Sequence, residues 1–327
     1  MRNTADSTRR AVITGIGVVS PIGIGRSQFW SALQTSQSGM TRISLFDASD
    51  FPCQVAAEIQ DFQPTDYMTP RAAKSVSRST QFGIAAWQLA LQDSGLDPYD
   101  ARNSNVIMGT AIDSHESINQ EIARHPALLQ KYEMVDPLLV QKVFIGGPAS
   151  AVAAQAGCEG YVSTVSTACT SGINAMGQAL RHIQTGQSRI VIAGAAEAPI
   201  TRLIVMGFCS SGFFIDEKDD PLNCLKPFDK GRRKCAPGEG SVVFIVEDAA
   251  YATARGARVY CEIEDFAQQN ENKAMFLPDK SGKIWAETIA RVAGGQKVDH
   301  INAHGISDQL RDKIESMAIE TALQRKA

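Results

Sequence analysis

Strand-like and helix-like segments alternate along most of the chain, and this alternation constrains the fold more than any other feature. The strand-like segments are rich in Val, Ile and Thr, whereas the helix-like segments are rich in Ala and place apolar residues three and four positions apart. The predicted strands are residues 12–16, 105–109, 161–167, 189–193 and 241–247, and the predicted helices are residues 27–35, 78–94, 146–156 and 172–183. Such alternation predicts a largely parallel sheet with helices on both faces. Residues 113–140, which include His115 and His125, are mixed and polar and predict a helical excursion over the core.

Composition excludes several classes of protein. The chain has 327 residues, of which 44% are hydrophobic, so a large core is possible. A net charge of −3 argues against a general nucleic-acid binder. The seven cysteines form no CxxC pair and show no Cys/His ligand spacing, which argues against a zinc site and favours the reducing cytoplasm. Residues 1–9 lack the apolar core of a signal peptide, and no apolar run reaches membrane-spanning length.

Glycines near the start of the chain raise the question of a dinucleotide-binding turn. The first predicted strand ends in glycines, Gly15 and Gly17, but Ser20 stands where the third glycine of that motif belongs. Pro21 also prevents a helix from starting at once. We therefore interpret these glycines as turn residues.

Cys169 lies where the predicted strand 161–167 turns into the predicted helix 172–183. The first N–H groups of a helix and its dipole favour a thiolate, so we expect a lowered pKa for this thiol. The same N–H groups can stabilise an oxyanion on an attacked carbonyl. Small neighbours such as Ala168 and Gly172 leave room for a substrate. A buried structural role is the more common one for a cysteine, but these surroundings favour a nucleophile that accepts an acyl group.

Four segments resemble the β-ketoacyl-acyl carrier protein synthases, the condensing enzymes of fatty acid and polyketide synthesis. They are Arg10–Pro21 (opening strand and turn), Ser166–Gly172 (nucleophile motif), Lys226–Asp229 with Arg232 and Gly238–Gly240 (PFD…R…GEG), and Asn302–Gly305 with Asp312 and Glu315 (first histidine motif). The resemblance implies the α/β, five-layer αβαβα thiolase-like fold. We expect a complete first half over residues 1–250, carrying the nucleophile, and a partial second half over residues 251–327, carrying the first histidine motif. Residues 258–265 and 299–304 predict strands of that second half, and residues 310–323 a helix.

The resemblance also implies roles for individual residues. Cys169 is expected to accept the acyl group, with its own backbone N–H as half of an oxyanion hole. His304 matches the first catalytic histidine, which as a neutral imidazole would stabilise the enolate formed from a malonyl thioester. Glu315 and Asp312 match supporting residues, and Ser307 keeps one hydroxyl that would contact the pantetheine arm.

The sequence departs from the family pattern at several positions. Ile306 and Asp308 stand where threonines are expected, and an acidic group there is unfavourable for a phosphopantetheine arm. After Arg232, the Asp-Gly-Phe that is usual in the family is replaced by Arg233-Lys234-Cys235. The sequence given ends before the positions of the family's lysine, second histidine and final Gly-Phe-Gly loop, so we expect the second half to be incomplete.

Two functions of different class remain open at this point. The first is a condensing acyltransferase that uses an acyl carrier protein, with no bound cofactor and with phosphopantetheine as the substrate's arm. The second is a non-catalytic partner, similar to a chain-length factor, that pairs with a true ketosynthase. A thiolase is a weaker third option. A homodimer or a ketosynthase heterodimer is expected in either of the first two cases, because the family's Cys-bearing region packs across a two-fold axis.

Overall fold

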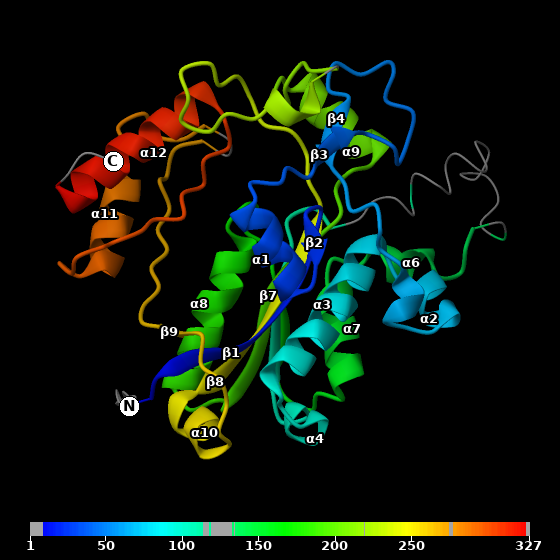
Figure 1. The fold of residues 1–327 in the computed structure, drawn as a ribbon, viewed down its shortest axis with the longest axis vertical. Coiled ribbons are helices and arrows are strands. Elements are labelled where there is room, and N and C mark those ends of the chain that lie inside the picture. Colours follow the sequence, from blue (N-terminus) through cyan, green and yellow to red (C-terminus); the bar gives the residue numbers. More distant parts are fainter. Residues whose placement is uncertain are drawn as a thin grey trace.

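A mixed seven-stranded sheet forms the centre of the computed structural model, which describes residues 9–113, 118, 133, 135–218, 220–274 and 277–324 (Figure 1). The strand order is β2 (Gly23–Ile24), β1 (Ala11–Ser20), β8 (Gly240–Asp248), β7 (Ile190–Glu197), β5 (Asn105–Gly109) and β6 (Val162–Val165), and β9 (Cys261–Ile263) also pairs with β1. A separate two-stranded sheet joins β3 (Met40–Arg42) and β4 (Val55–Ala57).

Only part of the large sheet is parallel. β5 runs parallel to both β6 and β7, whereas β8 lies antiparallel between β1 and β7, and β9 is antiparallel to β1. The prediction of a largely parallel sheet was therefore wrong for this seven-stranded sheet. Hydrophobic periodicity reports which segments are strands, but it carries no information on the direction in which a distant strand such as β8 enters the sheet.

Helices cover both faces of the sheet, as the sequence predicted (Figure 1). α3 (Arg78–Ser94) and α7 (Gly147–Ala156) cover one face, and α8 (Ser171–Gln184) covers the other. The strand pattern decides which residue joins which core: Ile192 packs with α3 and α7, and Val191 packs with α8. Each such fully buried aliphatic side chain contributes roughly 1.5–3 kcal/mol, so the two cores fix the sheet and its helices as one body.

Shorter helices connect these layers. They are α1 (Arg26–Gln34), α2 (Pro70–Ser75), α4 (Pro98–Ala101), α6 (Leu139–Val143), α9 (Arg202–Ser210) and α10 (Ala249–Ala254). Most of the predicted excursion at residues 113–140, including His115 and His125, lies outside the described residues. None of the helices that the structure describes combines the length and apolar character needed to cross a bilayer.

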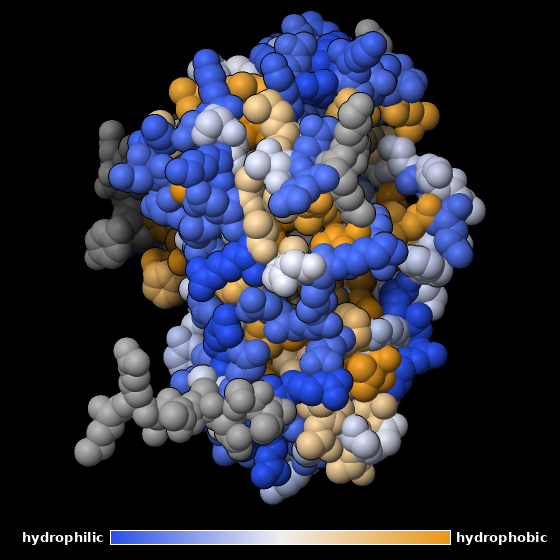
Figure 2. Space-filling view, turned by 90° about the vertical axis from the view of Figure 1, so that its left-hand side faces the viewer, coloured by the Kyte–Doolittle hydropathy of each residue, from blue (hydrophilic) through white to orange (hydrophobic). Residues whose placement is uncertain are grey.

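The described residues after β9 form two helices, α11 (Lys283–Ala293) and α12 (Gln309–Leu323), which pack together on the side of α8 (Figure 1). The predicted helix at residues 310–323 is confirmed. The predicted strand at residues 258–265 is reduced to β9, which joins the first sheet, and residues 299–304 form no strand. A strand needs a neighbour for its backbone N–H and C=O groups, and the described chain offers residues 299–304 none. The face seen in Figure 2 is mainly hydrophilic, with apolar side chains scattered across it.

Candidate active site

The turn that carries Cys169 between β6 and α8 is tightly held. Ala168 has a positive φ of 54°, which turns the chain sharply before the cysteine. The Ser171 hydroxyl accepts the N–H of Thr167 at 2.9 Å and donates to the carbonyl oxygen of Ala168 at 2.7 Å. Gly109 lets the start of α8 approach β5, because a Cβ atom there would lie 2.5 Å from the Ser171 carbonyl carbon. The predicted strand-to-helix turn is thus present, and Cys169 at its tip is exposed.

The thiol of Cys169 hydrogen-bonds to the side chain of His304, and this contact is the main reason why the pKa of Cys169 is lowered. Burial opposes the shift, and the positive charge of Arg311 adds to it. The predicted direction of the pKa shift is confirmed, but its main cause is a histidine from a distant segment and not the terminus of α8.

The same contact raises the pKa of His304, against a smaller opposing effect of burial. A lowered thiol pKa beside a raised imidazole pKa favours a thiolate–imidazolium pair. The role of His304 as a neutral imidazole at the decarboxylation step stays a prediction.

Glu315, on α12, fixes the backbone around His304. Its Oε1 accepts the N–H of His304 at 2.7 Å, and its Oε2 accepts the N–H of Gly305 at 2.9 Å. Gly305 has a φ of 45°, and a Cβ atom there would lie 2.8 Å from a ring carbon of Phe228. Only glycine fits this position without strain, so the Glu315 carboxylate and Gly305 together determine where His304 stands.

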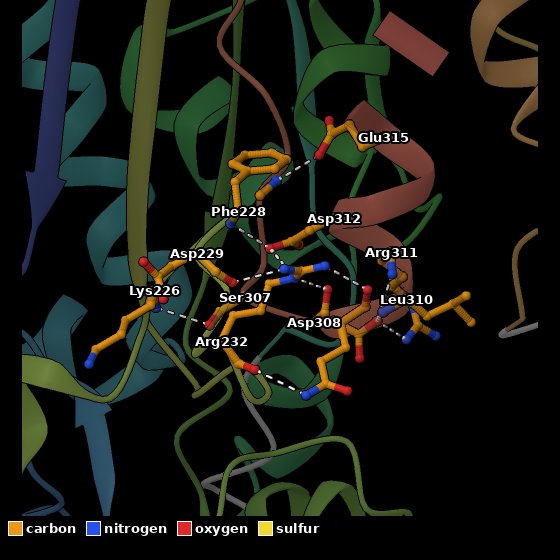
Figure 3. A network of polar contacts seen from close by, with 12 residues as sticks. Lys226, Phe228, Asp229, Arg232, Ser307, Asp308, Leu310, Arg311, Asp312 and Glu315 are labelled. Atoms are coloured by element: carbon orange, nitrogen blue, oxygen red, sulfur yellow. Dashed lines mark hydrogen bonds and ion pairs between the residues drawn. The ribbon is translucent and has the colours of Figure 1, made fainter. Parts of the chain in front are cut away.

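Asp312 joins the histidine motif to the PFD…R segment (Figure 3). Its carboxylate is almost fully buried, and Oδ2 accepts the N–H of Phe228 at 2.9 Å and lies 3.7 Å from Nε of Arg232. Phe228 itself has a positive φ of 64°. Two motifs that are about 80 positions apart in the chain therefore form one polar network, in which Asp312 has a structural role.

Ser307 and Asp308 are also occupied within the protein (Figure 3). Ser307 is fully buried, and its hydroxyl accepts the N–H of Lys226 at 3.0 Å. The structure thus gives this hydroxyl a structural bond in place of the predicted contact with a substrate arm. Asp308 caps α12, since its Oδ1 accepts the N–H groups of Leu310 and Arg311 at 3.1 and 2.8 Å.

Two residues near the thiol were not predicted as site residues. The guanidinium of Arg311 lies 5.2 Å from the ring centroid of Phe213. The thiol of Cys235 donates to the carbonyl oxygen of Phe213 at 3.6 Å, and burial raises its pKa to about 12. A local signal for Arg311 did exist, because it precedes Glu315 by four positions and so shares its helix face. No group of three or more His, Cys, Asp or Glu side chains within the described ranges is placed to hold a metal ion.

Comparison with known families decides what this site belongs to. The family model for the N-terminal domain of beta-ketoacyl synthases matches residues 8–252, and the model for their C-terminal domain matches residues 260–327. The chain belongs to the beta-ketoacyl synthase family. The predicted family is therefore confirmed, whereas the predicted division at residue 250 stays a prediction.

Similar curated proteins come from both polyketide and fatty acid synthesis. The tetracenomycin polyketide synthase ketoacyl synthase alpha subunit of Streptomyces glaucescens is 35% identical over 336 residues, covering 99% of this chain and 79% of the relative. The 3-oxoacyl-[acyl-carrier-protein] synthase 2 of Vibrio harveyi is 34% identical over 325 residues, covering 97% of this chain and 78% of the relative.

Solved structures agree with this assignment. The ishigamide ketosynthase/chain length factor matches with a TM-score of 0.86 and 29% identity, covering 96% of this chain and 78% of that one. A beta-ketoacyl synthase from Burkholderia phymatum STM815 matches with a TM-score of 0.84 and 25% identity, covering 98% and 79%. These likenesses confirm the predicted thiolase-like α/β fold.

Proposed function

We propose that this beta-ketoacyl synthase accepts an acyl group from an acyl carrier protein onto Cys169 and condenses it with a malonyl thioester. The observation that carries the proposal is the exposed thiol of Cys169, hydrogen-bonded to His304 and lowered in pKa. A thiolate is the nucleophilic form of cysteine, and an exposed one at a tight turn can reach a thioester carbonyl.

In the first step, the thiolate of Cys169 attacks the carbonyl carbon of the incoming acyl thioester. A new C–S bond forms to Cys169, and the C–S bond to the pantetheine arm breaks. The departing pantetheine sulfur leaves as a thiolate and takes a proton, which the imidazolium of His304 supplies in this proposal.

Acylation then changes the state of His304. The sulfur of an acylated Cys169 carries no negative charge, so the main cause that raises the pKa of His304 is removed. Having given up its proton, His304 stays neutral and can donate an N–H to the oxygen of a malonyl thioester as that thioester loses carbon dioxide. The enolate carbon attacks the acyl carbonyl on Cys169, the C–S bond to Cys169 breaks, and Cys169 leaves as a thiolate. A proton from water restores the imidazolium of His304 before the next acyl group arrives.

The proposed acyl donor is an acyl carrier protein, and the arm that reaches Cys169 is its phosphopantetheine. One structural neighbour, 28% identical with a TM-score of 0.86, is a type II polyketide synthase ketosynthase, bound to the hexaketide, in complex with its acyl carrier protein. We propose no bound cofactor for the chain itself. Seven free cysteines support a reducing compartment, the cytoplasm.

A homodimer or a ketosynthase heterodimer is proposed across β6. This strand ends the sheet order, and Tyr161 and Val162 at its start are 53% and 39% exposed. An exposed apolar edge strand is a ready site for pairing with a second chain. Light scattering at micromolar concentration tests this, and a monomer would contradict it.

A non-catalytic partner role is the second candidate. It is favoured by Ile306 and Asp308 at positions where the family has threonines, and by the structural use of the Ser307 hydroxyl. A partner subunit that only shapes a tunnel has no need of an activated thiol, so the lowered pKa of Cys169 favours the catalytic role.

Intact-mass spectrometry after incubation with short-chain and long-chain acyl thioesters of an acyl carrier protein separates the two roles. We expect an acyl adduct on the unmodified protein and on the control Cys261→Ala, which removes the other exposed thiol, but none on Cys169→Ala. If no donor gives an adduct, only the partner role remains. An adduct without release of carbon dioxide from malonyl thioester would mean that acyl loading occurs alone.

A further inference from the structure

The residues that follow β5 link the end of β7 to the turn that carries Cys169. β5 lies between β6 and β7 and is parallel to both, so the carboxyl ends of the three strands meet at one edge of the sheet. Residues 110–112, here called the 110–112 loop, leave β5 at this edge, and Glu197 is the last residue of β7. A side chain that holds this loop can therefore act on the nucleophile without touching it.

Glu197 binds the 110–112 loop through its carboxylate. Oε2 accepts the N–H of Ala111 at 2.6 Å, Oε1 accepts the N–H of Ile112 at 3.1 Å, and the Thr110 hydroxyl donates to Oε2 at 3.3 Å. Among the described residues, no lysine or arginine pairs with this carboxylate. Hydrogen bonds from the loop are therefore its main compensation for burial.

Thr110 connects the loop to the segments on both sides of the nucleophile turn. Its N–H donates to the carbonyl oxygen of Val165, the last residue of β6, at 3.0 Å. Its carbonyl oxygen lies 3.1 Å from the hydroxyl of Ser171, which also donates to the carbonyl oxygen of Ala168. Thr110 and Ser171 are both buried, so water does not compete for these bonds. The loop, the end of β6 and the start of α8 thus form one hydrogen-bonded unit around Cys169.

Burial makes the ionised carboxylate of Glu197 unfavourable for stability. It is the largest influence on the pKa of Glu197, which is raised in spite of the N–H donors. A carboxyl group with a higher pKa in the folded than in the unfolded state binds more protons when folded, so its ionisation at neutral pH lowers stability. A neutral glutamine loses charge-assisted hydrogen bonds but also the penalty of a buried charge. Stability alone therefore does not explain a carboxylate at this position.

We propose that Glu197 is a positioning residue, which holds the 110–112 loop so that Ser171 keeps Cys169 in the geometry in which its thiol contacts His304. Without this hold, the turn loosens, the thiol contacts the imidazole in fewer molecules, and less thiolate forms. The consequence is a less reactive thiol in a protein of undiminished stability. A role in the reaction rests on the proposed acyl transfer, but the effect on the thiol itself does not.

Alkylation of Cys169 with iodoacetamide measures this effect without any acyl transfer. The rate is followed by peptide mass spectrometry over a range of pH, and urea unfolding followed by circular dichroism measures the stability of each variant. We expect Glu197→Gln to lower the rate at neutral pH about fivefold, as the loss of roughly one hydrogen bond from the turn predicts. The pH midpoint of the reaction should rise, and the urea midpoint should not fall.

Glu58→Gln is the matched control, because Glu58 is also a buried glutamate that holds a loop. Its carboxylate accepts the N–H groups of Ser44 and Leu45 and the hydroxyl of Ser44. In the part of the chain that the structure describes, no hydrogen bond joins these two residues to the Cys169 turn, so the alkylation rate should stay unchanged. An equal loss of rate in Glu58→Gln would overturn the proposal.

Two outcomes for Glu197→Gln itself would also overturn the proposal. The first is a variant that alkylates like the unmodified protein. The second is a variant that fails to fold or unfolds at a clearly lower urea concentration, because the carboxylate would then be a structural group.

A double-mutant cycle tests the route through Ser171. If Glu197 acts through the Ser171 hydroxyl, then adding Glu197→Gln to Ser171→Ala should slow alkylation no further, and additive losses of rate would overturn the route. The intact-mass experiment with acyl carrier protein thioesters is run on the same variants. If no thioester gives an adduct while alkylation still responds to Glu197, the positioning role stands and the acyl-transfer proposal fails.

Discussion

Glu315→Gln removes the charge that holds the backbone of His304 and Gly305. In the unmodified protein the two carboxylate oxygens accept these N–H groups at 2.7 and 2.9 Å. Glutamine keeps one acceptor oxygen but points an NH₂ group at the second N–H. A hydrogen bond to a charged group contributes about 1.5–3 kcal/mol, so losing one and weakening the other in a half-buried site should cost about 2 kcal/mol.

Urea unfolding followed by circular dichroism measures this cost. The matched control is Glu287→Gln on α11, where the exposed carboxylate makes a long ion pair of 3.8 Å with Nζ of Lys283. We expect this control to change the free energy of unfolding by less than about 0.5 kcal/mol. In Glu315→Gln, displacement of His304 should also move the alkylation midpoint of Cys169 to higher pH. A variant that unfolds and alkylates like the unmodified protein would refute the role of Glu315 as the group that positions His304.

Three further changes test the surroundings of the site. His304→Ala removes the main cause of the lowered pKa of Cys169, so the pH midpoint of its reaction with iodoacetamide should rise, and an unchanged midpoint would contradict the pairing. Gly305→Ala forces a Cβ into a residue with a φ of 45° and should cost about 1–2 kcal/mol in urea unfolding, together with slower alkylation of Cys169. Glu239→Gln breaks a buried ion pair with Arg78 at 2.6 Å and should cost about 3 kcal/mol by the same assay, whereas a loss below about 1 kcal/mol would show that the pair adds little.

Local signals made the helices the most predictable part of the fold. The helix at residues 78–94 has the bounds that its sequence indicated, because Ser77 caps its start and Gly95, with a φ of 58°, ends it. The direction of β8 was not predictable, since an antiparallel strand and a parallel one show the same buried pattern. The strand predicted at residues 299–304 failed for a related reason: strand formation depends on a neighbour that a local pattern does not reveal.

The site shows the same division between local and distant information. Cys169 could be identified as a nucleophile from its strand-to-helix turn, but its contact with His304 bridges 135 positions and only the resemblance to a family brought the two together. Ser307 has a φ of 68°. Glycine and asparagine in a sequence indicate such a backbone conformation, but serine does not, so the burial of its side chain could not be predicted. Arg311 shares a helix face with Glu315, but its place over the ring of Phe213 depends on a distant segment that the local pattern does not reveal.

The protein activates one exposed thiol, and a second exposed thiol in the same chain serves as an internal control. Cys169 and Cys261 are both exposed residues, but His304 lowers the pKa of Cys169, whereas partial desolvation of its thiol raises the pKa of Cys261. Site-resolved alkylation with iodoacetamide as a function of pH measures both thiols in one sample. We expect Cys169 to react first as the pH is raised and to react at pH values where Cys261 is inert. Equal midpoints, or a higher midpoint for Cys169, would contradict it.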